Sequence, residues 1–325
     1  MNDFYHVCMT AHGEVLLRSE DDARDITNLI ALSAFRSGTQ ILVDAIMSNH
    51  MHFIVLSENP ARFVLSMRIS ITKHFNARHR RKGSLFDRKE FISRLEGARH
   101  ITMAINYVLK NPVHHGQTST PYSYKYSSAN YLFADERGVT APRLIARHTD
   151  DIRFIGPYFP KNAKVPETVA VDGNGMASRL SFEEIRLVES FYFTPNSFIY
   201  NMNRKTSDDW IKEQEQDNVK QVPITLELIE KGVKTETLKE MLKNENGLRF
   251  SRSVKSDTEV CQLVDNELIS KYRAISIYCI DIKQRLQIAL TLIKDYHIPM
   301  AVAARCSIVQ PSELKKALEN AIVIK

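Results

Sequence analysis

Apolar residues follow two different spacings over the first 110 residues, and the spacings predict strands mixed with helices. Short apolar runs rich in Ile, Leu and Val predict strands, at residues 5–10, 40–47, 51–56 and 86–95. Longer segments of mixed apolar and polar residues predict helices, at residues 21–37, 60–81 and 98–110. Gly38 is the expected stop of the first helix, and Asn111-Pro112 that of the third, because the residue before proline disfavours helical geometry.

The order of these elements indicates the fold class. The Ser48-Asn49 turn is so short that the strands on either side of it are expected to form a hairpin. The whole order is strand, helix, strand, strand, helix, strand, helix, which predicts an α+β sandwich with an antiparallel sheet covered by helices on one side.

Beyond this region the pattern changes twice. We place the end of the first domain near residue 140, so that it spans 1–140. Residues 141–180 carry four prolines and a polar Gly-rich turn cluster, which predicts an irregular linker. Residues 181–325 are expected to form a mostly α-helical domain, with helices at 182–191, 226–231, 235–244, 257–272 and 281–296 and two short ones after them.

Composition allows this two-domain interpretation. The chain has 325 residues, of which 43% are hydrophobic and 25% charged, so a packed core is expected and disorder is not. The formal net charge is +6, but residues 58–100 hold eleven basic and four acidic side chains, and the rest of the chain is close to neutral. Such a run is either a solvated helix face or a surface for a polyanion such as nucleic acid. The candidate DNA contacts in it are Arg78, Arg80, Arg81, Lys82 and Arg88.

Several classes of protein are disfavoured. The four cysteines form no CxxC pair, so neither a zinc knuckle nor a disulfide framework is predicted. The first ten residues lack a secretion-signal pattern, and no apolar run approaches the roughly 18 residues of a membrane helix. We therefore expect a cytoplasmic protein with no membrane partner. The absence of a GxxxxGK[ST] loop argues against a nucleotide cofactor.

His50 and His52 flank Met51 at the start of a predicted strand. Residues i and i+2 of a strand face the same side, so both imidazoles project together and are placed to chelate a divalent ion. A pair of surface histidines is the alternative for so short a motif.

Tyr107 lies on the predicted helix that ends before Pro112, four residues after Met103 and four before Asn111. Positions four apart on a helix share a face, so the phenol of Tyr107 and the amide of Asn111 are expected to reach one ion together. A phenol has a pKa of about 10 and needs a metal or a base to act as a nucleophile at neutral pH. The alternative is a tyrosine that only packs against the sheet.

Two runs then show a resemblance to a known family. The run SNHMHFIV (48–55) resembles the histidine–hydrophobic–histidine strand of the HUH endonucleases, and NYVLKNPVHHG (106–116) resembles the tyrosine helix of the REP-associated tyrosine transposases. Tyr5-His6-Val7 and Tyr126-Ser127-Ser128 also fit that family, and the resemblance covers residues 4–135.

The resemblance implies a ferredoxin-like antiparallel sheet and an enzyme that cuts single-stranded DNA at hairpin ends. Tyr107 would attack a phosphate and form a 5′-phosphotyrosine, which a different 3′-hydroxyl then reverses. His50, His52 and Asn111 would hold Mg²⁺ or Mn²⁺, which polarises the phosphate. His114-His115 departs from the family pattern, and we leave both outside the ligand set.

The end of the chain suggests a second DNA-binding element. Predicted short helices at 299–305 and 311–320 follow the helix that ends at 296, and residues 286–320 have the layout of a helix-turn-helix with Lys315 and Lys316 exposed. Plain helical packing or dimerisation is the alternative, and a homodimer is expected from family likeness alone.

Three functions compete at this point. The leading one is a transposase that transfers DNA strands as part of a mobile element. The alternative is a DNA-binding regulator derived from a transposase that no longer cuts. The third is an unrelated metal hydrolase that uses His50 and His52, which leaves the Tyr107 helix unexplained.

Overall fold

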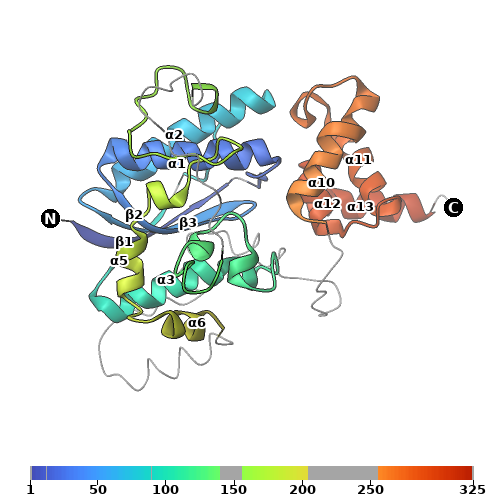
Figure 1. The fold of residues 1–325 in the computed structure, drawn as a ribbon. Helices are drawn as coiled ribbons and strands as arrows, with labels where there is room; N and C mark the ends of the chain where they lie inside the picture. Colours follow the sequence, from blue (N-terminus) through green and yellow to red (C-terminus); the bar gives the residue numbers. More distant parts are fainter. Residues whose placement is uncertain (1, 12, 89, 140–155, 204–254, 324–325) are drawn as a thin grey trace.

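The computed structural model describes residues 2–11, 13–88, 90–139, 156–203 and 255–323 (Figure 1). The helices predicted at 226–231 and 235–244 lie outside the described residues.

A four-stranded sheet forms the centre of the first half of the chain. Its order is β2-β3-β1-β4, and every neighbouring pair is antiparallel. The predicted hairpin is confirmed, because β2 and β3 pair directly. The last strand is shorter than the predicted 86–95, since Phe86 makes only an isolated bridge to Ala11. The strand bounds are β1 (Asp3–Thr10), β2 (Gln40–Ile46), β3 (His50–Ser57) and β4 (Phe91–Leu95).

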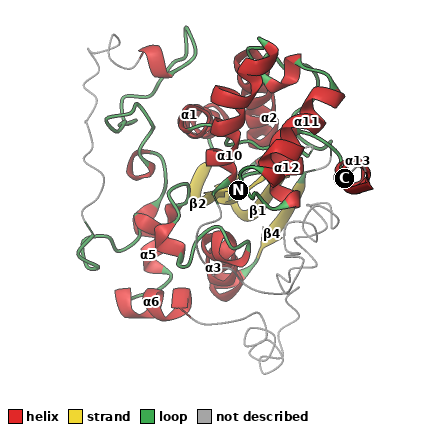
Figure 2. Ribbon diagram, turned by 90° about the vertical axis from the view of Figure 1, so that its right-hand side faces the viewer, coloured by secondary structure: helices red, strands yellow, loops and turns green. Residues whose placement is uncertain are grey.

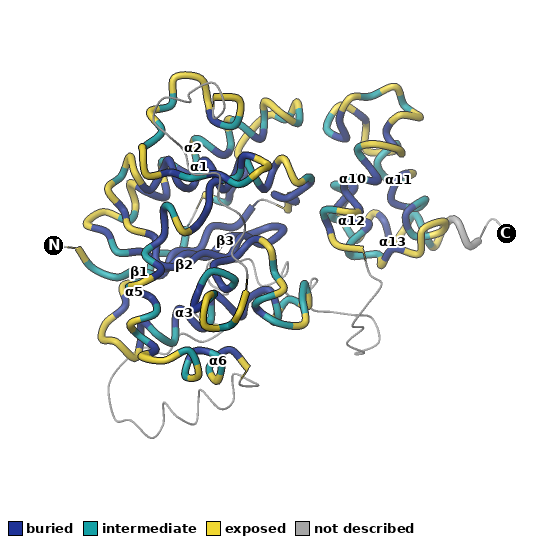
Figure 3. Tube along the Cα trace, in the orientation of Figure 1, coloured by how far each residue is buried: buried dark blue, intermediate teal, exposed yellow. Residues whose placement is uncertain are grey.

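Helices cover both faces of this sheet, so the expectation of one covered side is wrong. One face packs on α1 (Glu20–Ser37) and α2 (Pro60–His79), and the other on α3 (Gly97–His114) (Figure 1). Alternation along β3 supplies both cores: Phe53 packs with the first pair of helices and Ile54 with α3. The strands β2 and β3 are accordingly buried along most of their length (Figure 3).

The α3 helix does not end at Asn111-Pro112, contrary to the sequence prediction. It continues to His114 with Pro112 inside its last turn, and the His115 N–H donates to the Asn111 carbonyl at 3.1 Å. A proline there removes one backbone donor while the surrounding turn keeps its bonds. Asn111 is therefore held inside the helix, one turn after Tyr107.

Residues 156–203 pack on the same body as the sheet. Val171 and Phe182 join the core under α1 and α2. Two short helices, α5 (Ile185–Ser190) and α6 (Pro195–Asn203), join the core around α3, with α5 starting three residues later than the predicted 182–191. The domain boundaries near residues 140 and 180 stay predictions.

The C-terminal residues form a helical bundle with its own core. The helix predicted at 257–272 is α-helical only as α10 (Asp257–Leu263) and continues as a π turn and a 3-10 turn. The remaining helices are α11 (Ile282–Lys294), α12 (Met300–Ser307) and α13 (Pro311–Val323). None of the helices in the described ranges is long and apolar enough to cross a membrane.

The bundle contacts the first body close to the end of α2 (Figure 2). The buried Arg18 guanidinium donates to both Asp265 carboxylate oxygens at 2.8 and 2.9 Å. The Tyr278 hydroxyl donates to Glu14 at 2.6 Å, and the Ser276 hydroxyl to the His79 carbonyl at 2.6 Å.

Candidate functional site

The two histidines of β3 lie side by side as the strand spacing predicts. His50 is fully buried and His52 is 1% exposed, and their ring centroids are 5.0 Å apart. Both side chains point to the face of the sheet that α3 covers, since Met51 between them packs in the opposite core.

Helix α3 brings the predicted tyrosine and asparagine onto the same histidines. The Asn111 Nδ2 donates to the Tyr107 hydroxyl at 3.2 Å, and the Asn111 Oδ1 lies 3.1 Å from His50 Nε2. The rings of Tyr107 and His52 have their centroids 5.6 Å apart. The structure therefore places these four residues, His50, His52, Tyr107 and Asn111, in one cluster.

The surroundings of His50 have the chemistry of a cation site. Burial lowers the pKa of His50 to about 4, so the ring is neutral at pH 7 and carries one hydrogen. That ring nevertheless faces two amide oxygens, Asn49 Oδ1 at 2.8 Å from Nδ1 and Asn111 Oδ1 at 3.1 Å from Nε2. One hydrogen occupies one ring nitrogen only, so the other nitrogen presents a lone pair that can bind a cation.

An amide oxygen is a ligand that suits Mg²⁺ and Mn²⁺, and the imidazole nitrogens favour Mn²⁺, the transition metal, of the two. The residues thus fit the expected metal. The described residues contain no group of three His, Cys, Asp or Glu side chains placed to hold a metal ion, so the candidate ligand set depends on the amide of Asn111.

His6 belongs to the cluster although it enters the sequence predictions only within the Tyr5-His6-Val7 motif. It is 1% exposed, its ring stacks on His52 at 5.3 Å between centroids, and its Nε2 lies 3.2 Å from His52 Nδ1. This contact occupies one nitrogen of His52 and orients the ring. His6 and Cys8 lie two residues apart and therefore on one face of β1, and Cys8 pairs with His52 on β3. This pairing brings His6 close to His52, but the register of two strands cannot be predicted from the sequence.

His115 also reaches the cluster, although it stands outside the predicted ligand set. Its ring centroid lies 5.0 Å from that of His50, and its Nδ1 is buried without a hydrogen-bond partner. His114 is exposed, and its ring stacks over Tyr107 with 6.3 Å between centroids.

The basic residues of α2 are not brought to this cluster, because α2 covers the opposite face of the sheet. Arg78 forms ion pairs with Asp21, Asp22 and Asp25, and the Arg81 guanidinium pairs with Glu14 at 3.0 Å. Both guanidinium groups are therefore paired with carboxylates of this chain, although Arg78 itself is exposed. The exposed basic residues near them are Arg80, Lys82 and Arg88.

Lys315 and Lys316 are exposed on α13, as predicted. Residues 308–310 separate α12 from α13, and Ile308 adopts the left-handed conformation (φ 56°) that ends α12. A pair of helices joined by so short a turn matches the expected helix-turn-helix layout.

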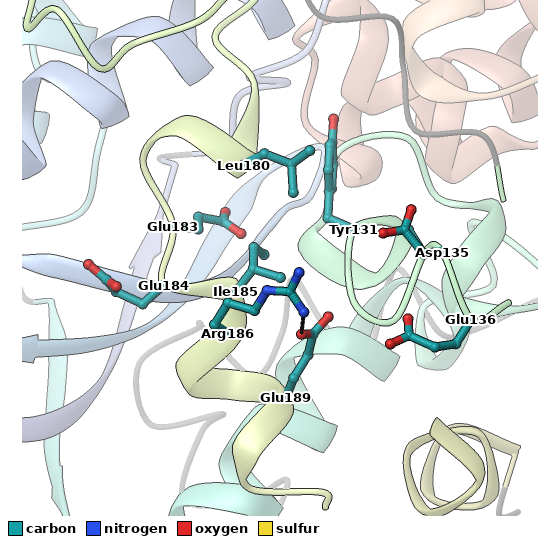
Figure 4. Close-up of a pocket in the computed structure, with 10 residues that line it drawn as sticks. Tyr131, Asp135, Glu136, Leu180, Glu183, Glu184, Ile185, Arg186 and Glu189 are labelled. Carbon is teal, nitrogen blue, oxygen red and sulfur yellow. Dashed lines mark hydrogen bonds and ion pairs between the residues drawn. The ribbon is translucent and has the colours of Figure 1, made fainter. Parts of the chain in front are cut away.

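A separate pocket of about 260 Å³ lies between α5 and the segment after Tyr131 (Figure 4). Five carboxylates line it, and the Arg186 beside them is bonded to Glu189 at 3.3 Å. It contains none of the predicted site residues. The acidic residues in its wall are Asp135, Glu136, Glu183, Glu184 and Glu189.

Comparisons with known proteins do not identify the family of this chain. The chain matches no family model and no curated protein. A solved structure of a REP-associated tyrosine transposase bound to a REP hairpin is similar over 43% of this chain and 82% of its own, with 14% identity and a TM-score of 0.36. A likeness this slight assigns neither fold nor function.

Proposed function

We propose that this protein is a metal-dependent single-tyrosine DNA transposase or endonuclease. It cuts single-stranded DNA with hairpin ends and rejoins it through a 5′-phosphotyrosine intermediate. In this proposal Tyr107 is the nucleophile, and His50, His52 and Asn111 hold Mn²⁺ or Mg²⁺.

One observation carries the proposal. The Asn111 amide joins the Tyr107 hydroxyl, at 3.2 Å, to His50 Nε2, at 3.1 Å. A tyrosine that only packs against the sheet needs a single hydrogen-bond partner for its hydroxyl. Asn111 could fill that role without also contacting His50, so the second contact is not explained by packing. A phenol used as a nucleophile needs a metal or a base nearby, and these contacts lead from the Tyr107 hydroxyl to His50, a ligand of the proposed metal.

Each group then has a defined chemical task. The Tyr107 oxygen forms a bond to phosphorus, the bond from phosphorus to the 3′-oxygen breaks, and the 3′-oxygen leaves as a hydroxyl. Asn111 orients the Tyr107 hydroxyl through its Nδ2, and His6 holds the ring of His52. The metal, when bound, supplies positive charge that polarises the phosphate. Because the phosphotyrosine conserves the energy of the broken bond, rejoining requires no nucleotide.

Other features support the DNA partner and the fold class. The strand order β2-β3-β1-β4, with α1 and α2 on one face, supports a ferredoxin-like arrangement of this body. The helices α12 and α13, joined by a short turn, support the proposal of a helix-turn-helix that contacts DNA through Lys315 and Lys316. We further propose that the protein forms a homodimer and that it serves a mobile element.

Covalent adduct formation tests the proposed function. Purified protein is incubated with Mn²⁺ and a library of hairpin-bearing single-stranded oligonucleotides, and adducts are separated on a denaturing gel. We expect an adduct with the wild type, none with Tyr107→Phe, and a normal yield with Tyr200→Phe, because Tyr200 is an exposed residue of α6. A chelator should also prevent the adduct. Binding without any adduct would favour the non-cutting regulator.

A further inference from the structure

Three buried polar atoms without hydrogen-bond partners belong to residues that adjoin His50 in the sequence or in space. They are Ser48 Oγ, Asn49 Nδ2 and His115 Nδ1. Ser48 and Asn49 form the turn that leads into His50, and the His115 ring lies 5.0 Å from it. A buried polar atom without a partner is unfavourable, so these atoms are open to hydrogen bonds with a group outside the chain.

Of these three residues, His115 is the least buried. Ser48 is 5% exposed and Asn49 is fully buried, whereas His115 is half-buried and follows the exposed His114. Its ring is therefore the most accessible of the three to a ligand from solvent, although the Nδ1 atom is buried.

The chemistry of the His115 ring selects a hydrogen-bond acceptor. A neutral imidazole carries a single hydrogen, which can lie on either ring nitrogen, and Nδ1 of His115 is buried without a hydrogen-bond partner. An anionic oxygen accepts hydrogen bonds and does not donate them, so it would fix that hydrogen on the orphaned Nδ1.

His115 and Tyr107 both adjoin the Asn111–His50 pair. Tyr107 contacts Asn111, Asn111 contacts His50, and His115 lies against His50. A phosphate that is attacked by Tyr107 and polarised by a metal on His50 would therefore lie near His115 as well.

We infer that His115 is a substrate contact whose Nδ1–H donates a hydrogen bond to a non-bridging oxygen of the scissile phosphate diester. The inference rests on the proposed function, and it adds a DNA-contacting residue to a site so far described by its nucleophile and its metal ligands.

The test measures adduct formation with Mn²⁺ on the hairpin oligonucleotide that gives the most adduct. His115→Ala should slow the reaction about 10-fold or more, the value of a lost hydrogen bond to a charged group. His115→Asn, which keeps an N–H donor, should recover part of the rate. His297→Ala, which removes an exposed histidine of the bundle, should match the wild type.

Neutral analogues of the scissile phosphate distinguish a direct hydrogen bond from His115 to the phosphate from a purely structural role of this residue. In one of the two methylphosphonate stereoisomers the contacted oxygen is missing, and on that substrate the wild type and His115→Ala should react at equal rates. Equal rates on native DNA would overturn the inference, and so would an unchanged defect on both stereoisomers. If the wild type forms no Tyr107-dependent adduct, the proposed function fails and the inference with it; if the adduct forms, the His115 result stands alone.

Discussion

At the scale of single residues, the site depends on the balance of donors and acceptors at His50. A neutral imidazole meets two amide oxygens, and Asn111 is the one that also binds the nucleophile. The amide of Asn111 thus links the proposed metal position to the Tyr107 hydroxyl. Removing this amide should therefore lower the affinity of the site for the metal.

We expect Asn111→Ala to weaken Mn²⁺ binding by about 10-fold or more, because one oxygen ligand is lost. Asn111→Asp should retain or tighten binding, since a carboxylate supplies an oxygen and a negative charge. Isothermal titration with Mn²⁺ measures both. Equal affinity in the wild type and Asn111→Ala would remove this residue from the ligand set.

Sequence spacing predicted part of this cluster and missed part of it. His50 and His52 follow from strand alternation, and Asn111 follows from helix spacing after Tyr107. His6 joins through a cross-strand register, and His115 through a helix that continues past Pro112. Neither depends on local spacing, so neither could be predicted from the sequence.

At the scale of elements, one buried ion pair joins residues 156–203 to the sheet. The Arg179 guanidinium donates to both carboxylate oxygens of Asp44 on β2, at 2.7 and 3.2 Å, and both side chains are at most 1% exposed. The Asp44 backbone N–H donates in turn to Ser128 at 2.6 Å. The proline-rich segment that the sequence predicts to be an irregular linker is thus partly a structural element of the first body.

Arg179→Met should therefore lower the free energy of unfolding by about 3–5 kcal/mol, because Asp44 is left charged and buried. Arg186→Met removes an exposed arginine seven residues later and should change it by less than about 0.5 kcal/mol. Urea unfolding followed by circular dichroism compares the two. Similar stabilities would show that segment 156–203 does not depend on this pair.

The element order was also largely predictable, since each predicted strand and helix of the first 115 residues exists. The predictions that were wrong concern where helices and strands end and which faces of the sheet are covered. Periodicity does not show that β3 is buried on both sides, which required α3 on the second face. The helix stop at Pro112 was overruled because a proline near a helix end removes only one backbone bond.

At the scale of the whole molecule, the C-terminal bundle contacts the first body beside the basic end of α2. Arg18, fully buried, pairs with Asp265 of the bundle, and Arg81 shares Glu14 with Tyr278. Basic charge in the predicted DNA-binding run therefore also serves the contact between the two parts. The exposed charge left for DNA includes Lys315 and Lys316 on α13.

The double variant Lys315→Glu, Lys316→Glu should bind DNA more weakly and with a smaller salt dependence. Loss of two phosphate contacts lowers the slope of log Kd against log salt by about 2. Lys161→Glu, Lys164→Glu makes the same charge change at exposed positions elsewhere and is the matched control. Fluorescence anisotropy over a salt series measures the slope, and an equal change in both variants would remove α13 from the DNA interface.

Peptide mapping of the covalent adduct shows whether Tyr107 becomes bonded to DNA. Adducts formed with Mn²⁺ are digested with nuclease and protease, and the modified peptide is sequenced by mass spectrometry. We expect a nucleotide joined by its 5′-phosphate to the peptide that contains Tyr107. A nucleotide on any other residue, or a phosphodiester joined through a 3′-phosphate, would exclude Tyr107 as the nucleophile of a 5′-phosphotyrosine.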